Sequence, residues 1–264
     1  MTLNYTGVVK PPIVGYNTDA IGTRAKIGVI VPATNTTVQP EMEAMRPSGV
    51  TNHVSRMFLP PRPYVDMEEY RRLLEVEEGD LDEALRLVML CEPAVIAEGH
   101  SIHSFRGDVE HGLAHQAALS AKAGVPFWTP STAVLEGLRA IGSPKKIAVL
   151  SPYWPPADEM IANFMRSAGF DVIGSGGMRA TGATNVARIE ADRVFEAFRA
   201  IDHPEAEALV QVGTALPVSF LTEQIEKEHG KPLIGVNVAT YWAALRSIGV
   251  TDQVRGFGRL FAEC

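Results

Sequence analysis

The sequence predicts an α/β fold made of two pseudo-symmetric halves, each built on a parallel sheet of the flavodoxin or Rossmann type, with the active site between them. Short apolar runs, which are typical of buried strands, alternate along the chain with longer stretches of helical periodicity. This alternation indicates crossover connections and therefore parallel strands. Near the middle of the 264 residues the pattern begins again, which indicates two similar halves.

The expected elements follow the same order in both halves. In the first half, apolar runs rich in β-branched residues predict strands at 26–32, 51–59, 94–98 and 126–128, and helical spacing predicts helices at 38–45, 67–90, 109–123 and 133–141. Side chains able to cap a helix stand before the first and the last of these helices. In the second half the strands are expected at 145–150, 170–173, 208–212 and 232–235, and the helices at 157–168, 186–200, 218–228 and 238–248.

Three sequence matches support an internal duplication. KIGVIVP from Lys26 matches KIAVLSP from Lys146, AVIAEGHS from Ala94 matches ALVQVGTA from Ala208, and the stretch from Val125 matches that from Lys231 with one residue of slip. Any two strand–helix units look alike, so one match alone would carry little weight. Three matches in one order and at similar separations favour duplication.

This duplication predicts the organisation of the chain. We expect an N-terminal extension over 1–24, a first half over 25–130 plus 236–264, and a second half over 131–235. The extension is expected to pack on the surface or to meet a partner subunit, so a homo-oligomer is compatible with the sequence.

Composition limits the function classes. A formal net charge of −7 argues against binding to nucleic acid or to an anionic membrane surface, and no apolar run is long enough for a membrane helix. The N-terminus lacks the charged-then-apolar order of a signal peptide. Only Cys91 and Cys264 are present, so we expect no disulfide framework and a cytoplasmic location.

Two strand ends carry the residues best suited to chemistry. The stretch AVIAEGHSIHSFRG runs from a strand into Gly99, His100, Ser101 and His103, and ALVQVGTALP runs from a strand into Gly213 and Thr214. Ligands of open α/β sheets bind outside the carboxyl ends of parallel strands. We therefore expect these two stretches to face each other across a cleft.

The residues also resemble a known family. IGVIVPATNTTVQPEME, at 27–43, resembles a carboxylate-binding loop of maleate isomerases, whereas GHSIHSFRG, PSTAVLEGLRAIG and GFGRLF resemble arylmalonate decarboxylase. The chain is thus similar, from about Arg24 to its end, to the arylmalonate decarboxylase and maleate cis–trans isomerase branch of the aspartate/glutamate racemase superfamily. This resemblance implies cofactor-free and metal-free chemistry on small carboxylic acids. It also implies two cysteines in racemases and isomerases, and in the decarboxylase only the second-half cysteine, as the proton donor.

The sequence departs from that pattern at the thiols. The position of the second-half cysteine falls on Val212, and that of the first-half cysteine on Gly99 or Glu98. Neither Cys91, which precedes its strand, nor Cys264, the last residue, is placed to substitute.

Other groups near Gly99 can carry the proton chemistry. We predict thiol-independent acid–base catalysis with His100, and with Glu98 or His103 as further catalytic candidates. Glu98 could instead pair with Arg106 or a loop amide, and His103 could be a packing residue. The spacing of Glu98, His100 and His103 does not match a zinc signature, so no metal is predicted.

The substrate-binding candidates are short donors and backbone N–H groups at the strand ends. The set comprises Asn35, Pro32, Gly99, Ser101, Tyr153, Gly213 and Thr214. Backbone N–H groups can bind an anion without a cationic side chain, and Pro32 is expected to line the pocket. Tyr153 matches, by the resemblance, the tyrosine that holds a substrate carboxylate in the decarboxylase. Asn35 and Thr214 could alternatively serve only as helix caps.

These observations lead to three alternative functions. The first is a cofactor-free enzyme that acts on a small (di)carboxylic acid, or on its enamine or amide derivative, through an activated water, as a hydrolase or lyase. The second is an arylmalonate-type decarboxylase or a maleate-type cis–trans isomerase. A further alternative is a non-catalytic carboxylate-binding protein.

Overall fold

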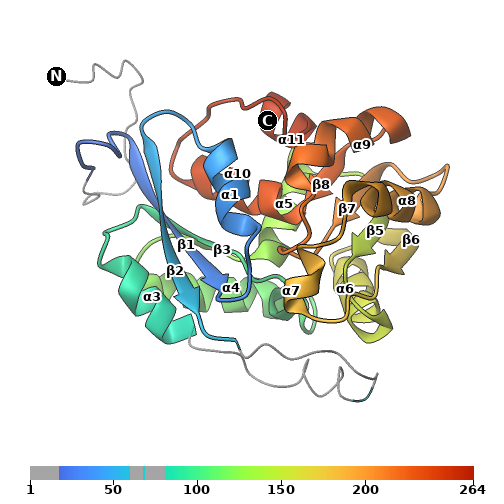
Figure 1. Ribbon diagram of the computed structural model, residues 1–264, viewed down its shortest axis with the longest axis horizontal. Coiled ribbons are helices and arrows are strands. Elements are labelled where there is room, and N and C mark those ends of the chain that lie inside the picture. Colours follow the sequence, from blue (N-terminus) through green and yellow to red (C-terminus); the bar gives the residue numbers. More distant parts are fainter. Residues whose placement is uncertain (1–17, 60–67, 69–80) are drawn as a thin grey trace.

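The computed structural model describes residues 18–59, 68 and 81–264, which form two four-stranded parallel sheets side by side (Figure 1). The first sheet has the order β2-β1-β3-β4 and the second the order β6-β5-β7-β8, so both halves share one topology. This identity of strand order agrees with the duplication inferred from the sequence. The predicted α/β class with two pseudo-symmetric parallel sheets is therefore confirmed.

The elements of the first half lie close to their expected positions. The strands are β1 (Ala25–Pro32), β2 (Val50–Met57), β3 (Val95–Glu98) and β4 (Phe127–Trp128), and the helices are α1 (Val38–Met45), α3 (Leu81–Met89), η1 (Ile102–Phe105), α4 (Val109–Ala123) and α5 (Pro130–Ala140). Helix α5 begins three residues earlier than expected, because Pro130 is pre-organised for the first helical turn. Of the helix expected at 67–90, residues 67 and 69–80 lie outside the described residues, as do residues 1–17 of the expected extension.

The second half differs more from expectation. Its strands are β5 (Lys146–Ser151), β6 (Asp171–Gly177), β7 (Ala208–Gln211) and β8 (Leu233–Gly235), and its helices are α6 (Pro155–Ser167), α7 (Ala183–Val186), α8 (Ala191–Ile201), η2 (Ser219–Leu221) and α9 (Thr222–His229). The chain ends with α10 (Val236–Ser247) and α11 (Arg259–Glu263). The helix expected at 186–200 begins only at Ala191, as α8, and the short α7 precedes it. The helix expected at 218–228 is divided into η2 and α9.

One hydrophobic core joins the two halves. Strand β1 is buried along its whole length, and its residues alternate between two cores. Val29 and Val31 contribute to a shared core that also holds Val149 and Val210 of the second sheet, whereas Ile30 faces an outer core under α3 and α4. Burial on both faces is typical of parallel sheets. The shared core fixes the halves against each other.

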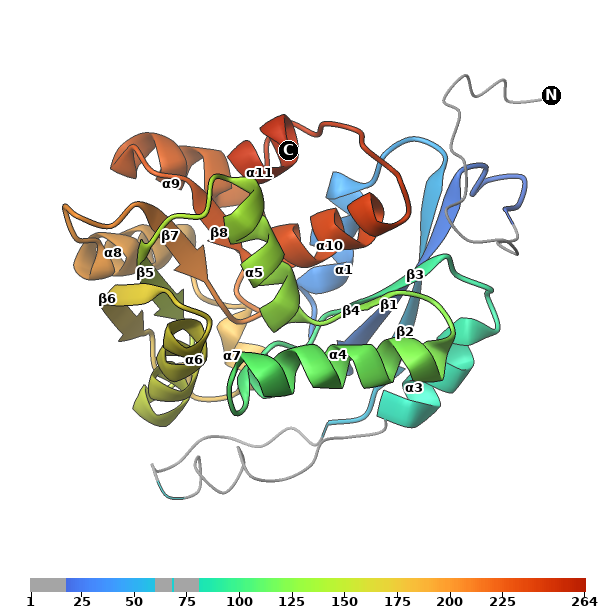
Figure 2. The ribbon, with the colours of Figure 1, turned by 180° about the vertical axis from the view of Figure 1, so that it is seen from behind.

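Helices α5 and α10 occupy the middle of the molecule (Figures 1 and 2). Helix α10 packs against α1, α5, β3 and β4, and also against β8 of the second sheet. The assignment of 236–264 to the first half therefore stays a prediction, because α10 contacts both halves. Among the described residues, no helix has both the length and the apolar character that a membrane crossing requires.

Candidate active site

The first-half loop follows β3 at Gly99 and turns at once into η1. Ser104 holds the turn, since its hydroxyl donates to the Ser101 carbonyl at 2.8 Å and accepts from the Ser131 N–H at 3.1 Å. Gly99 is required by close packing, because a Cβ there would lie 2.7 Å from Val31 Cγ1 and within 3.0 Å of both Val38 methyl groups. The tight turn places His100 and Ser101 at the carboxyl end of β3.

The second-half loop follows β7 and is fixed by different contacts. Gly213 adopts φ 107°, and a Cβ at this position would lie 2.3 Å from Pro152 Cδ, so only glycine fits. The buried Gln211 side chain donates to the Gly213 carbonyl at 2.9 Å and accepts from the Val236 N–H at 3.3 Å. These bonds hold Thr214 beside the first-half loop.

The two loops contact each other directly. The Thr214 hydroxyl donates to the Gly99 carbonyl at 2.8 Å, and the Thr214 N–H donates to Ser101 Oγ at 3.3 Å. Ser101 Oγ also lies 3.1 Å from the Tyr153 hydroxyl. The structure thus brings together Gly99, Ser101, Tyr153, Gly213 and Thr214, which come from strand ends in both halves.

Asn35 joins this group from the loop after β1. Its Nδ2 donates to Thr214 Oγ1 at 3.3 Å, while its Oδ1 accepts from the N–H groups of Thr37 and Val38 at 2.9 and 3.0 Å. Asn35 therefore caps α1 and contacts the second-half loop at the same time, so the two roles expected for it are not exclusive. Pro32 is buried at the end of β1, and its carbonyl accepts from the Asn35 N–H.

A half-buried carboxyl group supports the Tyr153 turn. The Tyr153 N–H donates to Ser151 Oγ at 2.9 Å, and the Ser151 hydroxyl donates to Asp158 Oδ1 at 2.5 Å. Burial raises the pKa of Asp158 to about 6, and the bond from Ser151 acts in the opposite direction. Asp158 and Ser151 therefore fix the backbone of the turn, and the Tyr153 hydroxyl points to Ser101.

The rings of His100 and His103 stack on each other. Their ring centroids are 5.1 Å apart with an interplanar angle of 28°. Burial, followed by the positive charges of His100 and Arg106, lowers the pKa of His103 to about 2. His103 is therefore neutral at physiological pH and unsuited to donate a proton as an imidazolium.

Glu98 ends β3 beside Ile30 and is 6% exposed, which makes it a buried carboxyl group next to the loop. The catalytic roles of His100, Glu98 and His103 stay predictions.

Neither position expected for a thiol carries one. Val212 is fully buried in the shared core, and the space around Gly99 is filled by Val31 and Val38. Cys91 lies just after α3, at the amino end of β3 and thus at the opposite edge of the sheet. Cys264 contacts the Ala140 carbonyl at the far end of α5. Both cysteines are therefore remote from the two loops.

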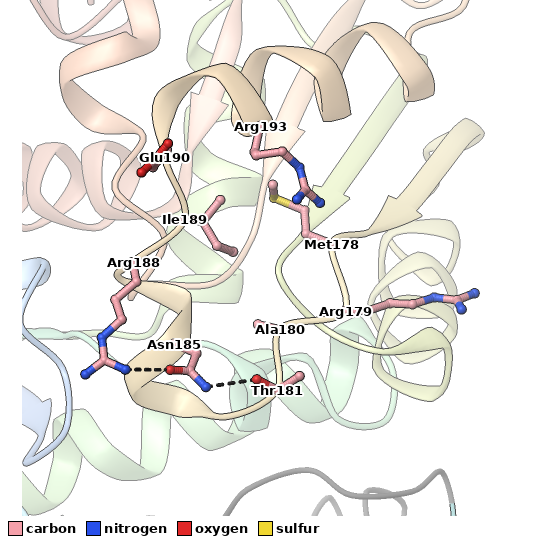
Figure 3. A pocket seen from close by; sticks show the side chains of 9 residues that line it. All are labelled: Met178, Arg179, Ala180, Thr181, Asn185, Arg188, Ile189, Glu190 and Arg193. Carbon is pink, nitrogen blue, oxygen red and sulfur yellow. Dashed lines mark hydrogen bonds between the residues drawn. The ribbon is translucent and has the colours of Figure 1, made fainter.

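A cavity of about 440 Å³ lies beyond the end of β6, beside the Tyr153 turn (Figure 3). Its wall joins that turn, since the Arg179 N–H donates to the Tyr153 carbonyl at 3.0 Å. Arg193 lies near Met178, whereas Arg179 points outward. None of the residues predicted for the site lines this cavity. Within the described part of the chain, no group of three His, Cys, Asp or Glu side chains is placed to hold a metal ion.

Sequence reasoning missed a set of buried polar residues behind the loops. Ser219 and Asn237 each donate to the Glu41 carboxylate, and Asn237 also donates to the Thr214 carbonyl. Glu41 had a visible signal, because it occupies a core-facing position of α1 together with Val38 and Met45. A charged residue at such a position needs buried partners.

Comparisons with known proteins agree on one family. A family model described as arylmalonate decarboxylase matches residues 27–261. A maleate isomerase of Nocardia farcinica is 28% identical over 246 residues, which cover 90% of this chain and 96% of the relative. An arylmalonate decarboxylase of Bordetella bronchiseptica is 31% identical over 194 residues, which cover 71% of this chain and 79% of the relative.

The fold is also shared with solved structures. A mutant of the Nocardia farcinica maleate cis–trans isomerase, with a covalently bound succinylcysteine intermediate, superposes with a TM-score of 0.79 at 25% identity. The match covers 91% of this chain and 99% of that one. The similarity therefore extends over both halves.

Proposed function

Because the chain belongs to the arylmalonate decarboxylase family, we propose that it is a cofactor-free enzyme that removes CO₂ from a small dicarboxylic acid of the malonate type, with His100 as the proton donor. The observation that carries the proposal is the contact between the two loops. Neutral donors from both halves meet at Ser101 and Thr214, an imidazole stands next to Ser101, and both cysteines lie elsewhere.

The arrangement suits a carboxylate held without a cationic side chain. When the Tyr153 hydroxyl donates to Ser101 Oγ, Ser101 keeps its own proton for another acceptor. Ser101 is fully buried, and hydrogen bonds to a charged acceptor are stronger in such surroundings than in water. The Gly99 N–H cannot contribute to this binding, because it already donates to the Ile30 carbonyl at 2.7 Å.

The proposed reaction needs one proton and no covalent intermediate. The bond between the α-carbon and one carboxylate breaks, CO₂ leaves, and the electron pair remains on the other fragment as an enediolate. The His100 imidazolium gives its proton to the α-carbon, and the ring regains a proton from water. A positioned acid of this kind contributes roughly 10²–10⁴-fold to the rate.

The alternatives expected from the sequence gain unequal support. The names of the two relatives describe an isomerase and a decarboxylase, and neither name describes a hydrolase. The solved isomerase structure carries a succinyl group on a cysteine, whereas this chain has Val212 at the expected second-half thiol position and Gly99 or Glu98 at the expected first-half position. Decarboxylation requires only binding and proton transfer, so we prefer it to maleate isomerisation and to hydrolysis by an activated water.

The experiment is a substrate panel assayed on the wild type and on His100→Gln. The panel contains α-substituted malonates, maleate and maleamate, with detection of CO₂, fumarate and ammonia respectively. We expect CO₂ release by the wild type that falls at least about 100-fold in His100→Gln, while affinity for unreactive malonate is kept. His111→Gln, a change on the exposed face of α4, is the matched control.

Other products would change the conclusion. Fumarate from maleate would replace the proposal by isomerisation, and ammonia from maleamate would replace it by hydrolysis. Binding of malonate without any turnover would favour a non-catalytic carboxylate-binding protein. The oligomeric state also stays a prediction, and sedimentation of the purified chain tests it.

A further inference from the structure

Glu41 is a buried carboxylate that ties three separate elements together. It lies on α1 of the first half and is 1% exposed. Its Oε1 accepts from the Ser219 N–H at 3.0 Å, and its Oε2 accepts from the Ser219 hydroxyl and from Asn237 Nδ2, both at 2.6 Å. Ser219 belongs to η2 of the second half and Asn237 to the first turn of α10.

Asn237 extends this network to the second-half loop. Its Nδ2 carries two hydrogens, and it donates to Glu41 and also to the Thr214 carbonyl at 2.9 Å. If the amide turned by 180°, its oxygen would face two acceptors and both bonds would be lost. The Glu41 carboxylate therefore determines which way the Asn237 amide points.

The network ends at the residues proposed to bind substrate. Thr214 is held through its carbonyl by Asn237, through its N–H by Ser101 and through its hydroxyl by the Gly99 carbonyl. Three hydrogen bonds thus connect Glu41 with Ser101, by way of Asn237 and Thr214. Glu41 itself is not among the residues that would touch the substrate.

We propose that Glu41 is a positioning residue, which fixes the Asn237 amide and thereby sets Thr214 of the second half against Ser101 of the first. Its expected effect on turnover rests on the proposed function, but its effect on Thr214 does not. Burial raises the pKa of Glu41 to about 7, and the hydrogen bonds from Ser219 and Asn237 act in the opposite direction. Above that pH the group is a carboxylate, which accepts all three donors at once. A glutamine has one oxygen, and its amide group would meet a donor of Ser219 or Asn237.

Glu41→Gln is the first variant. Exchange of the Thr214 amide hydrogen, followed by NMR, reports directly on its bond to Ser101. We expect this exchange to accelerate about tenfold or more, the factor typical of one lost hydrogen bond to a charged group. The KM for the malonate is expected to rise by a similar factor, with a smaller change in kcat.

Glu226→Gln is the matched control. Glu226 is also a buried carboxyl group, and it accepts from the N–H groups of Leu233 and Arg259, away from the two loops. This variant should lose stability and leave Thr214 exchange and KM unchanged. Equal changes in both variants would mean that Glu41 acts only through global stability, and that result would overturn the proposal.

A double-mutant cycle tests whether Glu41 acts through Asn237. Asn237→Ala alone should accelerate Thr214 exchange as Glu41→Gln does, and the double variant should show no more than the larger single effect. Additive effects would contradict the proposal. If Glu41→Gln does not fold, Asn237→Ala still decides the question, because unchanged Thr214 exchange in that variant removes the link.

The two proposals can fail separately. Exchange of the Thr214 amide needs no substrate, so it decides the role of Glu41 even if no tested acid is turned over. If turnover is found and Thr214 exchange is unchanged in both variants, the role of Glu41 is wrong and the proposed function stands.

Discussion

The loops after β3 and β7 occupy equivalent places in the two halves, but they carry different chemistry. The first-half loop contains His100 and His103 behind the buried Glu98, and His103 is held neutral by its burial. The second-half loop contains Val212, Gly213 and Thr214, none of which titrates near neutral pH. The same backbone topology therefore supports a titratable loop on one side and a neutral hydrogen-bonding loop on the other.

The difference shows that the two halves of a duplicated fold can carry different functions. Val212 belongs to the shared core, so the second half contributes packing and the donors of Thr214. The first half contributes the imidazoles, which stack at the carboxyl end of β3. We infer that proton transfer lies with the first half, and that the second half orients the substrate.

Replacement of His100 should produce the largest effect. His100→Gln is expected to lower kcat for the malonate by roughly 10²–10⁴-fold, because the proton donor of the first-half loop is lost. The measurement is CO₂ release at saturating substrate, with malonate affinity determined by calorimetry. If kcat fell by less than about threefold, the inference that the first half carries out proton transfer would be wrong.

Restoring a thiol should have unequal costs in the two halves. Gly99→Cys is expected to destabilise the fold by about 1–3 kcal/mol, because its Cβ would meet Val31 and Val38. Val212→Cys should cost less than about 1.5 kcal/mol, since cysteine packs as a small apolar group. Urea unfolding of both variants measures the difference, and equal costs would contradict the packing argument.

The pH dependence of stability should report on His103. Its pKa is lowered to about 2 in the fold, while an unfolded histidine titrates near about 6.5. Below pH about 6.5 the unfolded chain binds a proton that the fold does not, so this group makes the fold less stable as pH falls.

The matched variant is His103→Gln, which lacks this ionisation. Between pH about 6.5 and 5 the wild type should lose about 1–2 kcal/mol more than the variant, as measured by urea unfolding at each pH. Parallel curves for the two proteins would show that His103 is not held neutral in the fold.

The sequence allowed most of the fold to be predicted, and part of the site. Helices 38–45 and 109–123 match α1 and α4, whose ends carry caps. Asn35 caps the start of α1, and α4 begins after Asp108, which accepts from the His111 N–H, and ends at Gly124 in the left-handed conformation. The short α7 and the later start of α8 could not be foreseen, since apolar spacing alone does not show where a helix begins. For the site, the expectation that ligands bind at the carboxyl ends of parallel strands correctly placed Ser101, Thr214 and Asn35 close to one another.

The buried polar residues behind the two loops could not be predicted in the same way. Glu41 is separated from Ser219 and Asn237 by most of the chain, and no local pattern says which distant donors a buried carboxylate will find. The cavity beyond β6 likewise depends on how α7 and α8 turn away from the strand. These features arise from tertiary packing and not from local propensity.

The central claim is that an imidazole performs the proton transfer and that no thiol takes part. The most direct test is kcat/KM for the malonate in the variant Cys91→Ala/Cys264→Ala, with and without His100→Gln. We predict that the cysteine-free enzyme keeps the wild-type value and that His100→Gln lowers it by roughly 10²–10⁴-fold. A loss of activity of about tenfold or more in the cysteine-free enzyme would contradict the claim, because a thiol would then take part in the reaction.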